Sequence, residues 1–222
     1  LERIAKRAMD VSSIVGEDVQ KVTGAVSQML RTGMAQSAEE AFDIVVKATQ
    51  NGINKSEDLI DTINEYSTHF RSLGLTGEQA LGLIQQALQA GARDADYAAD
   101  AIKEFQINAV AGSDRVVKAL KEMGLNADEL VKKIAEGGPG AAEAFDTILD
   151  KLREIKDPVE RNALAVELVG TKAEDLADAL FAMDLDTAAK QFGEFGGAAQ
   201  SASDQLHQTA ANRLESFKRT VQ

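Results

Sequence analysis

The sequence predicts an all-α protein, a compact array of stacked helical hairpins followed by a longer C-terminal helix. Three observations support this fold class. Only 2 of the 222 residues are prolines, and 44% of all residues are apolar, with alanine abundant. Apolar residues recur at helical spacing along the chain, and alternating strand patterns are absent from it. Helix-capping residues precede most of these stretches, and glycines follow many of them.

Residues 1–36 are predicted to form N-terminal helices. Apolar residues of the first stretch fall on one helical face, and Gly16 ends that stretch. A second apolar stripe follows at the same spacing. The two stripes consist of Leu1, Ile4, Ala8 and Val11, and of Val19, Val22, Val26 and Met29.

Residues 37–137 are predicted to be a repeated helical-hairpin region. Ser37 and Thr76 each stand three residues before a glutamate or glutamine, which predicts a capping box at both helix starts. Gly52 and Gly91 are expected to end these helices in a left-handed turn. The second helix of the first hairpin is predicted to start at Asn54, with Glu57 as its capping partner.

The repeat itself is visible in the residues. Aligned with an offset of 39, residues 39–66 and 78–105 share eight identities in 28 positions, whereas chance would give about two. A weaker copy begins at Leu125, where Asn126 and Glu129 form the cap. One hairpin is too small to cover its own apolar face, so neighbouring hairpins must stack. A solenoid of the TPR or HEAT kind and a compact bundle both satisfy this requirement.

Residues 138–197 are predicted to form a second helical subregion. Asp157 followed by Pro158 is a strong helix start, because proline fits the first helical position. Thr171 and Glu174 predict another capping box. Gly196 and Gly197 break the chain before its last segment.

Residues 198–222 contain no glycine or proline and are predicted to form one helix that continues into a rod. A single apolar seam runs along it at steps of four, four, three and four, and its flanks are polar. The candidate self-association seam consists of Leu206, Ala210, Leu214, Phe217 and Val221. The pattern is compatible with a terminal core helix and with a rod that associates with copies of itself.

Composition and motifs argue against catalysis and against several kinds of ligand. The formal net charge of −12 opposes binding to nucleic acid phosphates, and it is also a common device for solubility. There is no cysteine, and neither His69 nor His207 has a second histidine at ligand spacing. Asp94, Asp96 and Asp100 lack the glycine and glutamate of a calcium loop and are interpreted as a helix start.

The glycine-rich residues 137–140 lack the lysine of a phosphate loop, and no serine lies in a nucleophile-elbow motif. We therefore predict no catalytic residue, no cofactor and no metal, and hence no enzyme. No apolar run approaches the roughly 20 residues of a membrane span, so no membrane contact is expected from this chain. Because the chain begins at Leu1 and not at methionine, we interpret it as a fragment of a longer protein.

Residues 74–107, GLTGEQALGLIQQALQAGARDADYAADAIKEFQI, resemble the core region of phage tail tape measure proteins. Residues 33–66 and the segment LVGTKAEDLADAL at 168–180 fit the same family. The motif is carried by Gly74, Leu75, Glu78, Ala80, Gly91, Ala92, Ala99, Asp100, Ala101, Lys103, Glu104 and Phe105.

The resemblance implies a structural role in a bacteriophage virion. The parent protein would lie in the lumen of the tail tube, set tail length and leave ahead of the DNA during genome ejection. The resemblance also implies its partners: itself, as a trimer; tail tube and tail tip proteins; and tail assembly chaperones in the host cytoplasm. No sequence-specific nucleic acid is expected among them. The alternative interpretation is a helical-repeat adaptor that binds a protein partner in a groove.

Overall fold

The computed structural model of the chain describes the backbone of residues 2–221 and the side chains of these residues except 172, 174, 175, 177 and 212–221. This part of the chain folds into thirteen helices and contains no strand, which confirms the predicted all-α class. The helices are α1 (Glu2–Val15), α2 (Val19–Thr32), α3 (Ala38–Gln50), α4 (Leu59–Ser72), α5 (Gly77–Gln89), α6 (Ala95–Val110), α7 (Asp114–Glu122), α8 (Ala127–Glu136), α9 (Gly138–Glu154), α10 (Pro158–Val169), α11 (Lys172–Ala182), α12 (Leu185–Phe192) and α13 (Ala198–Val221).

The helix boundaries follow from local chemistry at the predicted caps. Thr76 accepts a hydrogen bond from the backbone of Gln79, whose side chain bonds back to the Thr76 N–H, so the predicted capping box is complete. Ser37 accepts from the backbone of Glu40 in the same way, but the Glu40 carboxylate bonds to the N–H of Gln36 instead. Asp94 accepts from the Tyr97 N–H at 2.8 Å, which confirms the interpretation of its segment as a helix start.

The ends of α3 and α5 confirm the predicted left-handed turns. Gly52 and Gly91 lie 39 residues apart, each has a positive φ (80° and 105°), and each stands directly after the last helical turn. In both turns the following N–H reaches back five residues, from Ile53 to Ala48 and from Ala92 to Ala87. This is the Schellman arrangement, for which glycine is the preferred residue because it adopts positive φ without strain.

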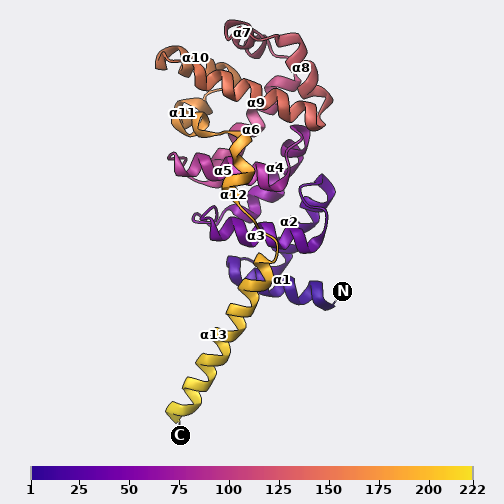
Figure 1. Ribbon diagram of the computed structural model, residues 1–222, viewed down its shortest axis with the longest axis vertical. Helices are drawn as coiled ribbons and strands as arrows, with labels where there is room; N and C mark the ends of the chain where they lie inside the picture. The colour runs from indigo at the N-terminus through magenta and orange to yellow at the C-terminus, as the bar shows by residue number, and fades with distance from the viewer. Residues whose placement is uncertain (1, 222) are drawn as a thin grey trace.

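The hairpins stack in two rows (Figure 1). Helices α2, α4, α6 and α8 follow one another in the first row, and α1, α3 and α5 form the second. Polar contacts link the first row: Lys21 of α2 pairs with Asp61 of α4 at 3.3 Å, and His69 of α4 bonds to Gln106 of α6 at 2.7 Å. The α1–α2 pair therefore occupies the place of a first hairpin, although its sequence does not align with the later copies.

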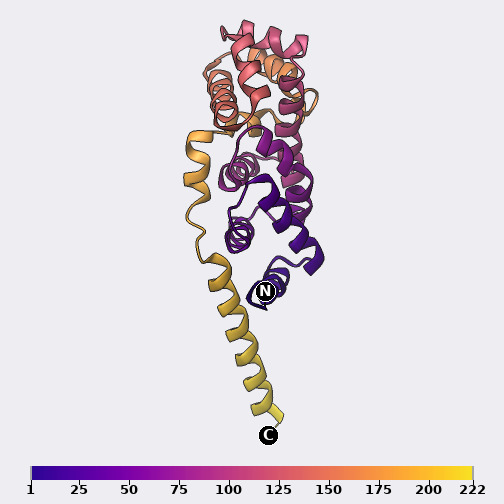
Figure 2. The same ribbon diagram turned by 90° about the vertical axis from the view of Figure 1, so that its right-hand side faces the viewer.

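The remainder of the chain runs back along the second row. Here we call Pro158–Val221, which contains α10 to α13, the return segment. Helix α10 packs on α6 and α7, α11 on α5 and α6, α12 on α5, and α13 on α3 and α1. Figure 2 shows the orange and yellow part of this segment running down one side of the purple hairpins. The return segment thus passes the hairpins in reverse order and forms a third row.

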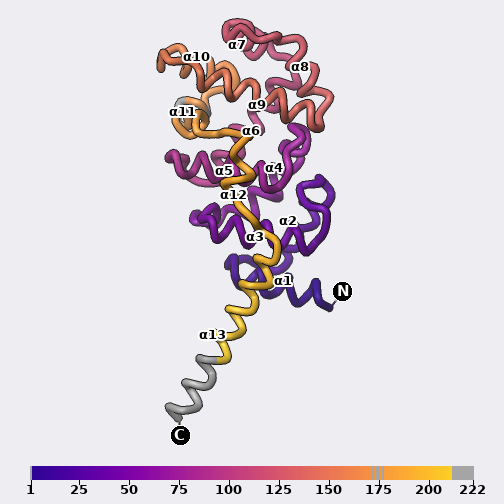
Figure 3. The backbone as a smooth tube through the Cα atoms, viewed as in Figure 1, coloured from indigo at the N-terminus to yellow at the C-terminus, as the bar shows by residue number. Residues whose placement is uncertain are grey.

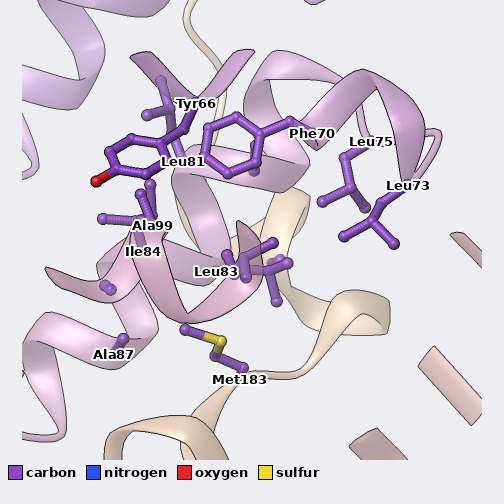
Figure 4. Close-up of a cluster of buried hydrophobic side chains, with 14 of the residues drawn as sticks. Tyr66, Phe70, Leu73, Leu75, Leu81, Leu83, Ile84, Ala87, Ala99 and Met183 are labelled. Carbon is purple, nitrogen blue, oxygen red and sulfur yellow. The ribbon is translucent and has the colours of Figure 1, made fainter. Parts of the chain in front are cut away.

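One hydrophobic core extends through all three rows. Its largest fully buried side chains include Phe42, Phe70, Phe105, Phe145 and Phe192, of which the last belongs to the return segment. In Figure 4, Met183 of the return segment lies beneath Leu83 of α5. The hairpins and the return segment therefore share one core.

Two local predictions fail, and two short helices were not predicted. Helix α4 starts at Leu59 and not near Asn54, because Glu57 adopts a positive φ of 59° and the Asn54 side chain accepts from the Leu59 N–H across the loop. Thr171 forms no side-chain cap, because its own backbone is already helical. Helices α7 and α12 were not predicted, since they have only 9 and 8 residues.

Candidate functional site

The most distinctive feature of the fold is the face on which the return segment lies, and this face is the candidate functional site. Helix α12 approaches α5 at Gly82, in the middle of α5. A Cβ atom on residue 82 would overlap the carbonyl oxygen of Ala188 in α12. Glycine costs a helix interior about 1 kcal/mol relative to alanine. The close backbone approach of α12 explains its presence.

Two amide side chains of the hairpins hold the ends of α12. The Gln86 side chain accepts from the Asp184 N–H at 2.8 Å and donates to the Asp184 carbonyl and to Thr187 at 3.2 and 3.1 Å. At the other end of the helix, the Asn51 amide donates to the Phe192 carbonyl at 2.9 Å. Phe192 itself is fully buried. Helix α12 is therefore fixed by backbone hydrogen bonds at both ends and by an aromatic anchor.

Helix α13 begins with a cap supplied from elsewhere in the chain. The residues before it, Gly196 and Gly197, carry no acceptor side chain. Instead, the carboxylate of Asp43 in α3 accepts from the N–H groups of Gly197 and Ala199, both at 2.8 Å. A negative charge at a helix N-terminus also interacts favourably with the helix dipole. The start of α13 thus depends on its contact with α3.

One turn further on, α13 meets the buried carboxylate of Asp10 in α1. Asp10 is 7% exposed, accepts a hydrogen bond from the Ser203 hydroxyl, and lies 3.0 Å from His207 Nε2. Burial raises the pKa of the Asp10 carboxyl, but hydrogen bonds from Ser203 and His207, with the positive charges of His207 and Lys6, bring the pKa below its ordinary value. Asp10 is therefore a charged anchor for α13.

Aspartate, serine and histidine meet here, but not as a nucleophilic site. The Ser203 hydroxyl donates to Asp10, not to His207, and Ser203 is only 4% exposed. A nucleophilic serine needs a base that removes its proton and a path for the substrate. The cluster therefore positions a helix and does not activate a nucleophile.

The structure brings only the first part of the candidate self-association seam into view. Leu206 is half-buried beside the body and Ala210 is exposed. Leu214, Phe217 and Val221 lie outside the residues whose side chains are described. From Asp204 to Ala211 every side chain except Leu206 is exposed, so the docked part of α13 ends near Leu206. In Figure 3 the backbone of α13 leaves the stacked helices beside α1.

The described residues contain no group of three or more histidine, cysteine, aspartate and glutamate side chains arranged to hold a metal ion. Among the same residues, no helix combines the length and apolar character needed to cross a membrane.

Sequence reasoning did not identify Asp10, Asp43, Gln86 or Asn51 as functional residues. Asp10, Asp43 and Gln86 lie on helices whose polar residues look like ordinary surface, and Asn51 lies in the turn after α3. The partners of Asp43 are about 150 residues away. A weak signal was present in the lack of any capping residue before Ala198. A helix of 24 residues that starts after two glycines needs an acceptor from another part of the chain.

Comparisons with known proteins agree with this structural character. Residues 1–170 match the family described as phage-related minor tail protein. The chain is 52% identical over 217 residues to the "Probable tape measure protein" of Streptomyces phage phiC31, covering 98% of this chain and 30% of that protein. It is 29% identical over 198 residues to the "Uncharacterized protein YqbO" of Bacillus subtilis (strain 168), covering 87% of this chain and 12% of that protein.

The chain thus spans less than a third of the length of either relative. No solved structure matches it. The family is a structural one and is not known as enzymatic. The chain therefore belongs to the phage-related minor tail proteins, in the family of phage tail tape measure proteins, and has a structural role in the virion.

Proposed function

We propose that this chain is a compact body within a tape measure protein that sets tail length inside the tail tube and is released ahead of the DNA during genome ejection. In this proposal the extended helical part of the parent protein determines tail length. The body is a folded region at a fixed position along that part. An α-helix advances 1.5 Å per residue, so a count of helical residues converts directly into distance.

The observation that carries the proposal is the course of α13. Hairpins α1 to α6 are packed against the return segment, and the helix that leaves this body becomes exposed after Leu206. In this proposal the folded body contributes a fixed length to the tail. The number of residues in the helix that leaves the body determines the variable part of the length. The similarity to the phage phiC31 protein, of which the chain covers 30%, supports a parent that is much longer than the body.

The alternative function, an adaptor that binds a partner in a groove, is less well supported. A helical-repeat adaptor usually offers one row of helices to its ligand. Here the row formed by α1, α3 and α5 is covered by α11, α12 and α13 of the same chain. An adaptor that used this row would have to displace the return segment.

The test is to lengthen the protein at two different places in the phage that encodes it. The same 28-residue helical segment, with apolar residues spaced as in the seam, is inserted after Ala211 in one phage and after Lys55 in another. Lys55 lies in the exposed loop between α3 and α4. We expect tails about 42 Å longer from the first insertion and tails of unchanged length from the second, measured by electron microscopy. Equal lengths from both phages would contradict the proposal.

We also propose that α13 associates with copies of itself along the seam, as a trimer according to the family resemblance. The narrow apolar stripe with polar flanks supports this proposal. A chain extended by several helical turns beyond Gln222 should sediment as an oligomer. The Leu214→Asp, Phe217→Asp double variant should sediment as a monomer. If both sediment as monomers, the seam is not an association surface.

The remaining partners are proposals of the same kind. They are tail tube and tail tip proteins in the assembled tail, and tail assembly chaperones in the host cytoplasm. A position in the tail lumen would place the acidic body, with its net charge of −12, against the inner wall of the tube. Copurification of the chaperones with the chain from infected cells, and its labelling by crosslinkers attached to tube subunits, would test these contacts.

A further inference from the structure

Helix α13 is held to the body in a different way from α12. The buried side chains of α12 are Leu185, Ala188 and Phe192. In α13, by contrast, the buried side chains between Ala198 and Ala211 are those of Ala199 and Ser203 alone. Both are small, and the half-buried Ala198, Ala202 and Leu206 add a limited apolar contact. Its attachment therefore depends mainly on polar groups.

Two carboxylates supply those polar groups. Asp43 accepts from the first N–H groups of α13, and Asp10 accepts from Ser203 and faces His207. Asp10 contacts the side chains of residues 203 and 207, which lie one turn apart on one face of α13, and Asp43 binds the backbone N–H groups at the start of the helix. Asp43 belongs to α3 and Asp10 to α1, which are the two helices on which α13 packs.

The connection between α12 and α13 has the composition of a hinge. It runs from Gly193 to Gly197 and includes Gly196, and Gly193 and Gly197 have positive φ values of 80° and 78°. Only Phe195 in this stretch carries a large apolar side chain, and its ring lies 6.2 Å from that of Phe192. Glycines allow wide changes in φ and ψ at little steric cost. The connection can therefore change direction while α12 keeps its place.

We propose that α13 is a hinged arm that Asp10 and Asp43 hold in its docked direction, and that it turns about residues 193–197 when these contacts break. Asp10 and Asp43 are positioning residues in this proposal. While α13 is docked, it leaves the body at a fixed angle. When its contacts with Asp10 and Asp43 break, that angle changes without unfolding of the hairpins. The inference concerns the body itself and does not depend on the role in tail length.

Distance measurements between two spin labels test the arm directly. The chain has no cysteine, so labels can be placed at Gln36→Cys in the body and Gln208→Cys on the arm, both exposed positions. We expect one narrow distance distribution in the unaltered chain. In Asp43→Ala, and separately in Asp10→Ala, the ratio of docked to displaced arm should fall about fivefold, the effect of losing one cap or one hydrogen bond to a charged group. Asp43→Asn keeps an acceptor oxygen and should restore part of the docked population.

Two further measurements make the result decisive. Asp61→Asn removes a carboxylate that pairs with Lys21 away from the arm, and it should leave the distribution narrow. A second label pair, at residues 36 and 191, reports on α12 and should be unchanged in every variant. A broad distribution in the unaltered chain, no change in the Asp10 and Asp43 variants, or equal broadening at residue 191 would each overturn the proposal. Loss of the helical circular dichroism signal in these variants would overturn it as well, because the carboxylates would then hold the body together.

Discussion

Asp43 and Gly82 occupy equivalent positions in successive hairpins, 39 residues apart, and both meet the return segment. At residue 43 a carboxylate caps α13, and at residue 82 the absence of a side chain admits the backbone of α12. The repeat has therefore diverged where the third row of helices packs on it. Two copies of one hairpin present different surfaces to two different helices.

Replacing glycine by alanine usually stabilises a helix interior. At Gly82 we expect the opposite effect, because α12 approaches so closely. Alanine at an unobstructed helix interior stabilises a protein by up to about 1 kcal/mol. At residue 82 its Cβ would overlap Ala188, so Gly82→Ala should lower the free energy of unfolding by about 1–3 kcal/mol. Gly24→Ala in α2 is the matched control, since the nearest atom to its Cβ would be Asn64 Oδ1 at 3.7 Å. Urea unfolding of the two variants should show opposite shifts, and shifts of the same sign would contradict the packing described.

The equivalent turns at Gly52 and Gly91 predict a cost for any β-branched residue there. Gly91 has a φ of 105° and open space around its Cα, so strain and not a clash determines the effect. Gly91→Val should cost about 1 kcal/mol or more of stability. Gly140→Val provides a control in equally open space without a positive φ. Thermal melting should place the Gly91 variant below the control, and equal melting midpoints would exclude a left-handed turn at residue 91.

The carboxyl group of Asp146 in α9 should make the free energy of unfolding depend on pH. Burial, with help from the nearby Asp150 and Asp186, raises the pKa of the Asp146 carboxyl to about 6. Its Oδ1 atom is buried and has no hydrogen-bond partner among the described residues. Because the folded-state pKa lies above the unfolded value of about 3.9, the folded protein binds this proton more tightly, and stability falls as pH rises from about 4 to about 6.

Asp146→Asn removes this titration and should stabilise the protein at pH 7. The group is partly exposed, so solvent screening reduces the gain to about 1 kcal/mol. The measurement is the difference in free energy of unfolding between the variant and the unaltered chain, taken at pH 4 and at pH 7. We expect a difference that grows with pH. A difference that is the same at both values would show that Asp146 ionises normally.

The side chain of Phe192 should contribute strongly to the attachment of the return segment. Its side chain is fully buried, whereas that of Phe195 is only half-buried. Phe192→Ala should cost about 3–5 kcal/mol, in the range of large-to-small core substitutions, and Phe195→Ala should cost less. Chemical denaturation of both variants provides the comparison. Equal and small losses would indicate that α12 is not part of the core.

Local chemistry made much of the fold predictable from sequence. Each of the caps at Ser37, Thr76, Asp94 and Asp157 joins a side chain to a backbone N–H only two or three residues away. Such local caps can be predicted from the sequence pattern. The failure at Thr171 is also local. Its residue type is right for a cap, but its backbone is already helical.

The candidate site could not be predicted for the opposite reason. The bonds of Asp43 to residues 197 and 199, and of Asp10 to Ser203, connect positions separated by 154 or more residues. Nothing in the surrounding sequence marks these aspartates, because a helix surface carries many acidic residues. Gly82 was the clearest signal of the site in the sequence. A glycine in the middle of a helix destabilises that helix, so its presence indicates close packing against another part of the protein.

The body ends near Leu206, and α13 continues beyond it as a separate helix. Amide hydrogen exchange along the 222-residue chain, followed by mass spectrometry, tests this boundary most directly. We predict slow exchange through α3–α6 and α12, where the helices are buried in the core. From residue 208 onward we predict fast exchange, because a single exposed helix is only marginally stable. Slow exchange through residue 211 would show that this part of α13 is packed into the body, and would contradict the account.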